Sequence, residues 1–238
     1  MGLSPTVHAS LRWTHTDQDQ SPCIYVLAGT NGAGKSSIAG ALFLAKGTDY
    51  FNPDDAAARI RVAKPRLSEA EANSQAWNQG TRLLQCAIAE RLNFAFETTL
   101  GGNTIPALLN SALSAGLEVR VWYIGLSSVE LHIARVRARV EKGGHPIPKQ
   151  KIRERFDRSR LNLIRLLPLL TELLVYDNSN EADPDVGERP EPKLLLHMAS
   201  GKIIGSYDLQ LIPEWAKPIL AAALKIAEIR GPVTPNPG

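Results

Sequence analysis

The chain has 238 residues, of which 44% are hydrophobic and 21% are charged, and its formal net charge is +3. This composition is ordinary for a soluble globular protein, and the charge is too small to argue by itself for a nucleic-acid partner. No apolar run approaches the roughly 18–20 residues that cross a membrane, and the N-terminus lacks the pattern of a signal peptide. The two cysteines, Cys23 and Cys86, lack metal-ligand spacing, so we expect buried thiols in a reducing cytoplasm.

The strongest motif follows an apolar, β-prone run at residues 23–28. It has the spacing Gly29-x4-Gly34-Lys35-Ser36 and precedes a run that can form a helix, which is the expected context of a phosphate-binding P-loop. Lys35 would reach the β- and γ-phosphates of a nucleotide, and the Ser36 hydroxyl would ligate Mg²⁺. A glycine-rich turn that binds nothing is the alternative. The expected nucleotide-binding residues are Gly29, Thr30, Asn31, Gly32, Ala33, Gly34, Lys35, Ser36 and Ser37.

Apolar strand-like runs alternate with helical runs along residues 22–180. This alternation predicts an α/β protein with the three-layer P-loop NTPase fold and a central parallel sheet of five strands. A small hairpin and a closing helix are expected near the C-terminus. The expected strands are 23–28, 49–52, 93–98, 118–125 and 173–177, and the hairpin comprises 193–197 and 201–207. We expect residues 1–21 to be a loose leader, 22–230 a single domain and 231–238 a tail.

Two carboxylates follow apolar strands. Asp54 comes just after the second strand, and Glu97 lies near the end of the third. In an open α/β sheet this edge is where ligands bind, so Asp54 is a candidate catalytic base. A plain helix N-cap, worth about 1 kcal/mol, is the alternative for Asp54. Burying an unpaired charge is costly, so Glu97 is expected to meet a cation or a polar ligand, or else to cap the next turn.

Residues 128–160 form the second informative feature, a basic helical hairpin around Gly143-Gly144. Such a hairpin resembles a mobile lid that could close over a triphosphate and supply cations to the transferring phosphoryl group. We expect two or three of its arginines to contact phosphate and the others to be a solvated charged face. His145 in the hinge is expected to be a turn residue rather than an acid or base.

Five stretches together resemble the zeta-toxin family of P-loop kinases. They are Leu27–Ser37, Phe51–Asp54, Phe96–Leu100, the hairpin from Arg139 through Gly143-Gly144-His145-Pro146-Ile147-Pro148 to Arg158, and Asp177–Ser179. The resemblance covers about residues 22–180. It implies an adenylate-kinase-like core and a kinase that uses ATP or GTP with Mg²⁺.

The resemblance also implies roles on the acceptor side of the site. Toxin members phosphorylate the sugar 3′-hydroxyl of UDP-N-acetylglucosamine, and an antitoxin protein blocks their nucleotide site. In this chain Asp54, Lys35 and Arg158 would be catalytic, and Glu97, Thr99, Arg135 and Arg139 would bind substrate. One position departs from the pattern, because Gly101 stands where the toxins have an arginine. Another small-molecule acceptor, and a kinase without toxicity, therefore remain open.

Two other function classes share parts of these patterns. The amino-acid sequence of the P-loop resembles that of ABC-type ATPases, but the chain has no Ser-Gly-Gly signature and no apolar strand that ends in Asp-Glu. A nucleotide-gated binding module, with the basic hairpin contacting nucleic acid or protein, is the non-enzymatic alternative. Such a module would bind nucleotide without making a phosphorylated product.

Overall fold

The computed structural model describes residues 21–36, 50–180, 191–206 and 209–230. The expected leader and tail, Ser37 and the helix after the P-loop lie outside the described residues, as does the acidic loop at 181–190. None of the helices in the described ranges is both long enough and apolar enough to cross a membrane.

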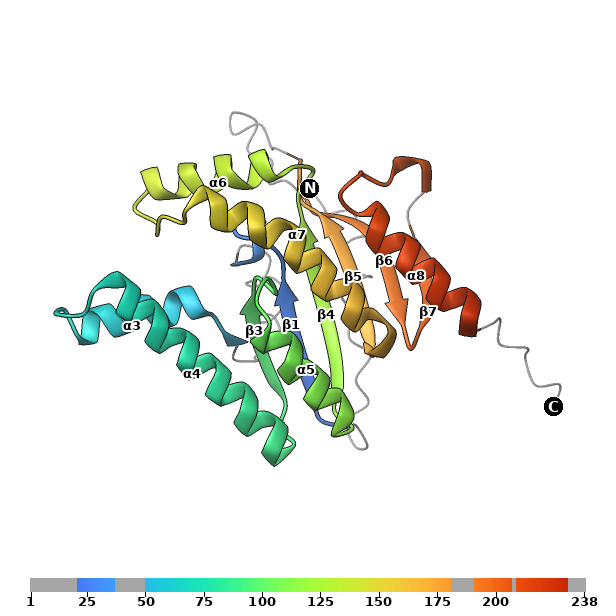
Figure 1. Cartoon of the computed structure of the whole chain (residues 1–238), viewed down its shortest axis with the longest axis horizontal. Helices are drawn as coiled ribbons and strands as arrows, with labels where there is room; N and C mark the ends of the chain where they lie inside the picture. Colours follow the sequence, from blue (N-terminus) through green and yellow to red (C-terminus); the bar gives the residue numbers. More distant parts are fainter. Residues whose placement is uncertain (1–20, 37–49, 181–190, 207–208, 231–238) are drawn as a thin grey trace, which may run out of the picture.

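In the described residues, one sheet of seven strands organises the fold (Figure 1), in the order β2-β3-β1-β4-β5-β6-β7. The strands are β1 Cys23–Ala28, β2 Tyr50–Phe51, β3 Phe94–Thr98, β4 Glu118–Gly125, β5 Glu172–Asp177, β6 Lys193–Ala199 and β7 Lys202–Ser206. The first five run parallel, which confirms the predicted parallel core. The expected five-stranded count is too small, because the predicted C-terminal hairpin pairs antiparallel with β5 and extends the sheet.

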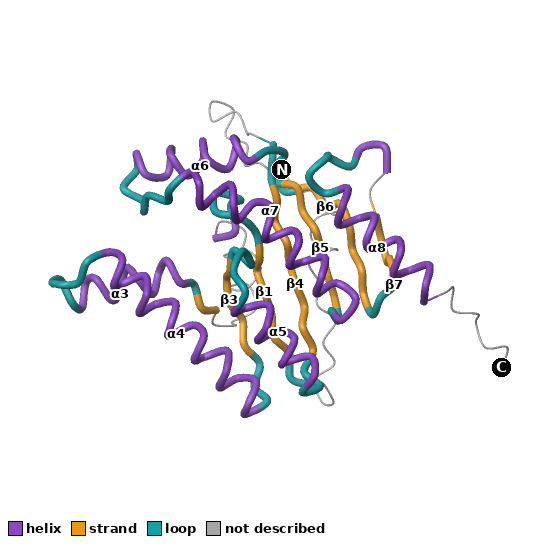
Figure 2. Tube along the Cα trace, in the orientation of Figure 1, coloured by secondary structure: helices purple, strands orange, loops and turns teal. Residues whose placement is uncertain are grey.

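Helices lie across one face of this sheet and beside its edge (Figure 2). The described helices are α3 Pro53–Ala63, α4 Glu69–Glu90, α5 Thr104–Ser114, α6 Val129–Glu141, α7 Lys149–Leu166 and α8 Lys217–Arg230. The helices α3 and α4 contact each other, as do α6 and α7, and in Figure 1 the pair α3–α4 lies at the left of the sheet, below α6. The P-loop follows directly after the C-terminal end of β1.

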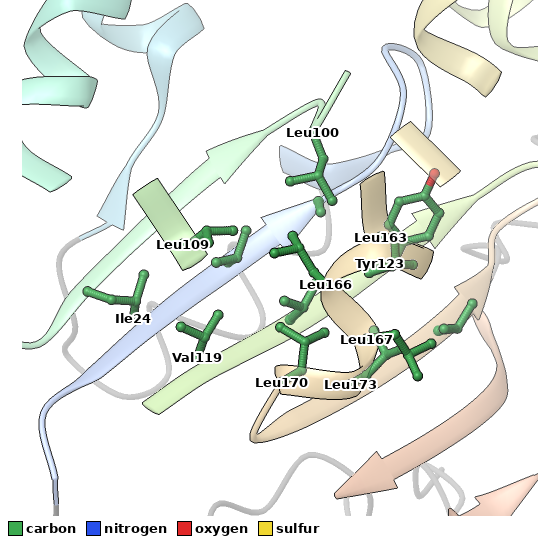
Figure 3. Close-up of a cluster of buried hydrophobic side chains, with 14 of the residues drawn as sticks. Ile24, Leu100, Leu109, Val119, Tyr123, Leu163, Leu166, Leu167, Leu170 and Leu173 are labelled. Carbon is green, nitrogen blue, oxygen red and sulfur yellow. The ribbon is translucent and has the colours of Figure 1, made fainter. Parts of the chain in front are cut away.

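Both faces of the central strands are buried. Neighbouring residues of a strand point to opposite faces, yet Val26 and Leu27 of β1 are both fully buried. Leu109 of α5 and Leu163 of α7 pack with Ile24 in the larger core (Figure 3). Each such side chain contributes about 1.5–3 kcal/mol through burial. This packing holds the C-terminal half of α7 against the sheet and leaves its N-terminal half beside the P-loop.

The helix α4 begins at a capping box, in which Ser68 and Glu71 bond reciprocally. On this helix Leu84 is fully buried and the preceding residue, Leu83, is 40% exposed. The same helix register places Cys86 on the solvent side, so the expectation of two buried thiols is wrong for Cys86. Cys23, on β1, is buried as expected.

Candidate active site

Glycines of the P-loop have positive φ angles, which residues other than glycine rarely adopt. Gly29 has φ 142°, and a Cβ there would lie 2.1 Å from the carbonyl oxygen of Ile124 in β4. Gly34 has φ 88°, and a Cβ there would lie 2.4 Å from the side-chain nitrogen of Asn178. Both glycines are therefore required by dihedral angle and by space. Turns of this kind present backbone N–H groups to anions.

Three elements from later in the chain hold the P-loop in place. His132 of α6 donates from Nδ1 to the carbonyl oxygen of Asn31 at 2.8 Å, and Arg155 of α7 donates to the Asn31 side-chain oxygen at 2.8 Å. Asn178, after β5, donates to the carbonyl oxygen of Ala33 at 2.8 Å. Burial lowers the pKa of His132 from 6.5 to about 4, so the imidazole is neutral at neutral pH. The loop is thus clamped from both helices of the basic hairpin.

Lys35, Ser36 and Glu97 meet at the ends of β1 and β3, which are adjacent and parallel. Lys35 Nζ lies 3.6 Å from Glu97 Oε1, and the two side chains are 6% and 10% exposed. The Ser36 hydroxyl donates to Glu97 Oε2 at 3.0 Å. The buried carboxylate of Glu97 is therefore compensated by a cation and a hydroxyl. Glu97 lies beside the residues expected to hold the nucleotide and the metal.

Asp54 is not the N-cap of α3. Asn52 occupies the cap, with Pro53 in the first helical position, and both residue types favour these places. The Asp54 side chain is 53% exposed, and its Oδ2 lies 3.5 Å from Nη1 of Arg139. The N-cap alternative is wrong, and the carboxylate faces the basic hairpin instead.

The candidate arginines of the hairpin separate in space. Arg139 pairs with Asp54, whereas Arg135 donates to the carbonyl oxygen of Asn180 at 3.3 Å. Arg158 is exposed and donates to the side-chain oxygen of Asn103 at 3.0 Å. The arginine that contacts the P-loop is Arg155, which the sequence reasoning missed.

The residue pattern of α7 could have identified Arg155 as a partly buried residue. Ile152, Ser159 and Leu163 form the buried face of that helix, and the helical spacing places position 155 on the same face. A charged residue at such a position indicates a buried partner. Burial lowers the pKa of Arg155, against the opposing influence of the Asp54 charge.

The turn after β3 is fixed against α7. Asn162 donates from its side-chain nitrogen to the carbonyl oxygens of Leu100 and Gly102, each at 2.8 Å. A Cβ at Gly101 would lie 2.8 Å from Cγ of Arg155, so this arrangement leaves no room for a side chain at position 101. Thr99, whose hydroxyl accepts from the Gly101 N–H at 3.4 Å, belongs to the same turn. The stem of Arg155, whose guanidinium bonds Asn31, therefore packs against the position at which the resembling toxins carry an arginine.

His145 has contacts beyond its expected place in a turn. Its ring pairs through Nδ1 with the Glu69 carboxylate, and its Nε2 accepts from the Asn73 side chain at 3.3 Å. Arg139 also donates to the carbonyl oxygen of His145 at 3.3 Å. The hinge of the basic hairpin is thereby tied to the first turns of α4.

The side chains fit a magnesium nucleotide. The Ser36 hydroxyl and the Glu97 carboxylate are oxygen donors of the type that Mg²⁺ prefers, and Lys35 offers a buried cation beside them. Among the residues that the structure describes, no three His, Cys, Asp or Glu side chains form a metal cluster. Mg²⁺ usually binds through one or two protein ligands, phosphates and water, so such a cluster is not needed.

Known proteins resemble this chain in sequence and in fold. The family model described as "Zeta toxin" matches residues 8–183. A protein of Haemophilus influenzae, described only as uncharacterized, is 34% identical over 129 residues, which are 54% of this chain and 88% of that protein.

Several solved structures match this chain in fold. A complex of AvrRxo1-ORF1 with AvrRxo1-ORF2 and sulphate ions matches with TM-score 0.60 and 18% identity, over 90% of this chain and 66% of that chain, so this chain spans about two thirds of that protein. The PezAT toxin–antitoxin system of Streptococcus pneumoniae matches with TM-score 0.50 and 15% identity, over 94% and 93%. A putative kinase of Chloroflexus aurantiacus matches with TM-score 0.52 and 14% identity, over 70% and 95%. Because the family model covers most of the chain, this protein belongs to the zeta-toxin family and has the fold of its P-loop kinases.

Proposed function

We propose that the protein is an ATP-dependent kinase that transfers the γ-phosphate to a hydroxyl group of a small molecule. One observation carries the proposal. Lys35, Ser36 and Glu97 gather at adjacent strand ends, and Asp54 pairs with an arginine of the basic hairpin, which also contacts the P-loop. Phosphoryl transfer requires these parts: phosphate binding, a metal ligand, a base and cations for the transition state.

The donor half of the site would hold Mg²⁺-ATP. The backbone N–H groups of the P-loop would bind the phosphates. The Lys35 ammonium group would leave Glu97 and contact the β- and γ-phosphates. Ser36 would ligate Mg²⁺, with Glu97 orienting its hydroxyl. When bound, the metal would neutralise charge that develops on the phosphates. A crystal structure of AvrRxo1-ORF1 and -ORF2 contains ATP, which supports nucleotide binding by the shared fold.

The acceptor half would lie between Asp54 and the turn at Thr99. Asp54 would take the proton of the attacking hydroxyl. Arg139, now paired with Asp54, would turn to the transferring phosphoryl group, and Arg155 would approach it from the P-loop. We assign acceptor binding to Glu97, Thr99 and Arg135. Arg158 we keep as a catalytic candidate, beside Asn103.

The first acceptor to test is a nucleotide sugar such as UDP-N-acetylglucosamine. The place of Gly101 against Arg155 favours testing other small-molecule acceptors as well, in a kinase without toxin activity. An antitoxin is a possible class of partner, because the PezAT match is a toxin–antitoxin system. We place this activity in the cytoplasm, in a single domain formed by residues 22–230.

The test is incubation with ATP or GTP, Mg²⁺ and a panel of nucleotide sugars and free sugars, followed by mass spectrometry of the products. A phosphorylated acceptor supports the proposal. ATP binding with slow hydrolysis and no phosphorylated acceptor would instead support the nucleotide-gated binding module.

A further inference from the structure

The Asn52 side chain lies at the junction of the two halves of the candidate site. It is 4% exposed, although it is polar. Its position is at the end of β2, as the N-cap of α3. The expected roles for the carboxylates and the P-loop leave this buried amide without a function.

The hydrogen bonds fix the orientation of the amide. Its oxygen accepts from the backbone N–H of Asp54 at 2.8 Å and of Asp55 at 3.4 Å. Backbone N–H groups can only donate, so Oδ1 must face α3 and the NH₂ group must face the other way. The first turn of α3, which carries Asp54, is thus held by one atom of Asn52.

The NH₂ group of the same amide points to the donor half. It lies 3.4 Å from Ser36 Oγ, 3.4 Å from Glu97 Oε2 and 3.4 Å from the hydroxyl of Tyr50. Two hydrogens shared by three acceptors make long bonds, so no single contact dominates. Together they place the amide against the hydroxyl expected to ligate Mg²⁺ and the carboxylate bonded to it.

We propose that Asn52 is a positioning residue that sets the metal-binding hydroxyl of Ser36 and the carboxylate of Glu97 in one fixed arrangement with the helix turn that carries Asp54. This inference rests on the proposed kinase function for its catalytic consequence. The groups that orient a metal ligand through hydrogen bonds typically change metal affinity or activity by about 10- to 100-fold when they are removed. A near-attack geometry likewise depends on the relative placement of base and phosphate.

The kinetic test uses Asn52→Ser, because serine still caps a helix but is too short to bond Ser36 and Glu97. We expect kcat to fall about 10- to 100-fold and the KM for ATP to stay within about threefold. Ser68→Ala is the matched control, since it removes the cap of α4 and should leave kcat unchanged. A kcat of Asn52→Ser within about twofold of the unsubstituted protein would overturn the proposal.

A second measurement does not depend on activity. Asn52→Asp keeps the capping oxygen but places a carboxylate against Glu97, so in EDTA at pH 7 we expect Tm to fall by about 2–8 °C. The fall should be largely removed by adding Glu97→Gln. Equal Tm losses with and without Glu97→Gln would show that Asn52 does not act on Glu97. If the unsubstituted protein forms no product, the kinase function fails, while this measurement still decides the contact.

Discussion

At the scale of single residues, the candidate site neutralises itself with two ion pairs. Lys35 pairs with Glu97 in a buried setting, and Arg139 pairs with Asp54 in a more exposed one. A buried charge is stable only when it is paired, so Lys35 and Glu97 compensate each other, whereas the pair of Arg139 with Asp54 is partly solvated. A triphosphate would compete for both cations and release both carboxylates toward the acceptor.

Asp54→Asn tests the role of the base. The amide cannot take a proton, so we expect kcat to fall by about 10²- to 10⁴-fold, with ATP affinity retained. Steady-state kinetics and calorimetric ATP binding measure the two effects. Asp55→Asn is the matched control, since it changes the same charge on the next residue of α3. Near-full transfer by Asp54→Asn would exclude Asp54 as the base.

Gly101→Ala tests the close approach of the turn to α7. The new Cβ would lie 2.8 Å from Cγ of Arg155, whereas at Gly102 nothing lies within 4 Å. We expect Gly101→Ala to lower the free energy of unfolding by about 1–3 kcal/mol and Gly102→Ala to have a much smaller effect. Urea unfolding of both variants measures the difference. Equal effects would contradict the packing described for Arg155.

At the scale of elements, the basic hairpin is joined to both sides of the site. α6 and α7 hold the P-loop through His132 and Arg155, while the hinge contacts α4 through His145. The predicted mobile lid therefore has its base anchored on Asn31 of the P-loop. If this lid opens, the contacts that break would be those of Arg139 with Asp54 and of His145 with Glu69, whose side chains are partly exposed.

His132 makes this anchor dependent on pH. Because burial lowers its pKa from 6.5 to about 4, the folded protein binds a proton at this site less readily than the unfolded chain does. The contribution to stability is complete above pH 6.5 and is lost as the pH falls toward 4. Between pH 7 and pH 4.5 we expect the unsubstituted protein to lose on the order of 2 kcal/mol more than His132→Gln. Urea unfolding at both pH values measures this, and identical losses would contradict the assignment.

At the scale of the whole molecule, local patterns predicted what depends on local chemistry. The P-loop spacing and the alternation of strands with helices predicted the parallel core. Pairings between distant segments were not predictable in the same way. The strand β6 pairs with β5 in a register that places Glu172 opposite Ala199. The hydrogen bond of Arg155 with Asn31 joins residues that are 124 positions apart in the sequence.

On the acceptor side, too, local features could be predicted from the sequence and contacts between distant segments could not. Glu97 could be predicted to need a partner because it ends an apolar strand, but its pairing with Lys35 depends on the adjacency of β3 and β1. The departure at Gly101 was visible in the sequence. The packing of Arg155 against it was not, because it arises from how α7 crosses the turn after β3.

We propose that this chain transfers the γ-phosphate of ATP to a small-molecule hydroxyl with Asp54 as base. The most direct measurement supplies ATP labelled with ¹⁸O in its γ-phosphate, together with Mg²⁺ and a small-metabolite extract, and locates the label by mass spectrometry. The expected result is a labelled phosphorylated metabolite that the unsubstituted protein forms and Asp54→Asn does not. Label found solely in inorganic phosphate, and released at equal rates by both proteins, would contradict the claim.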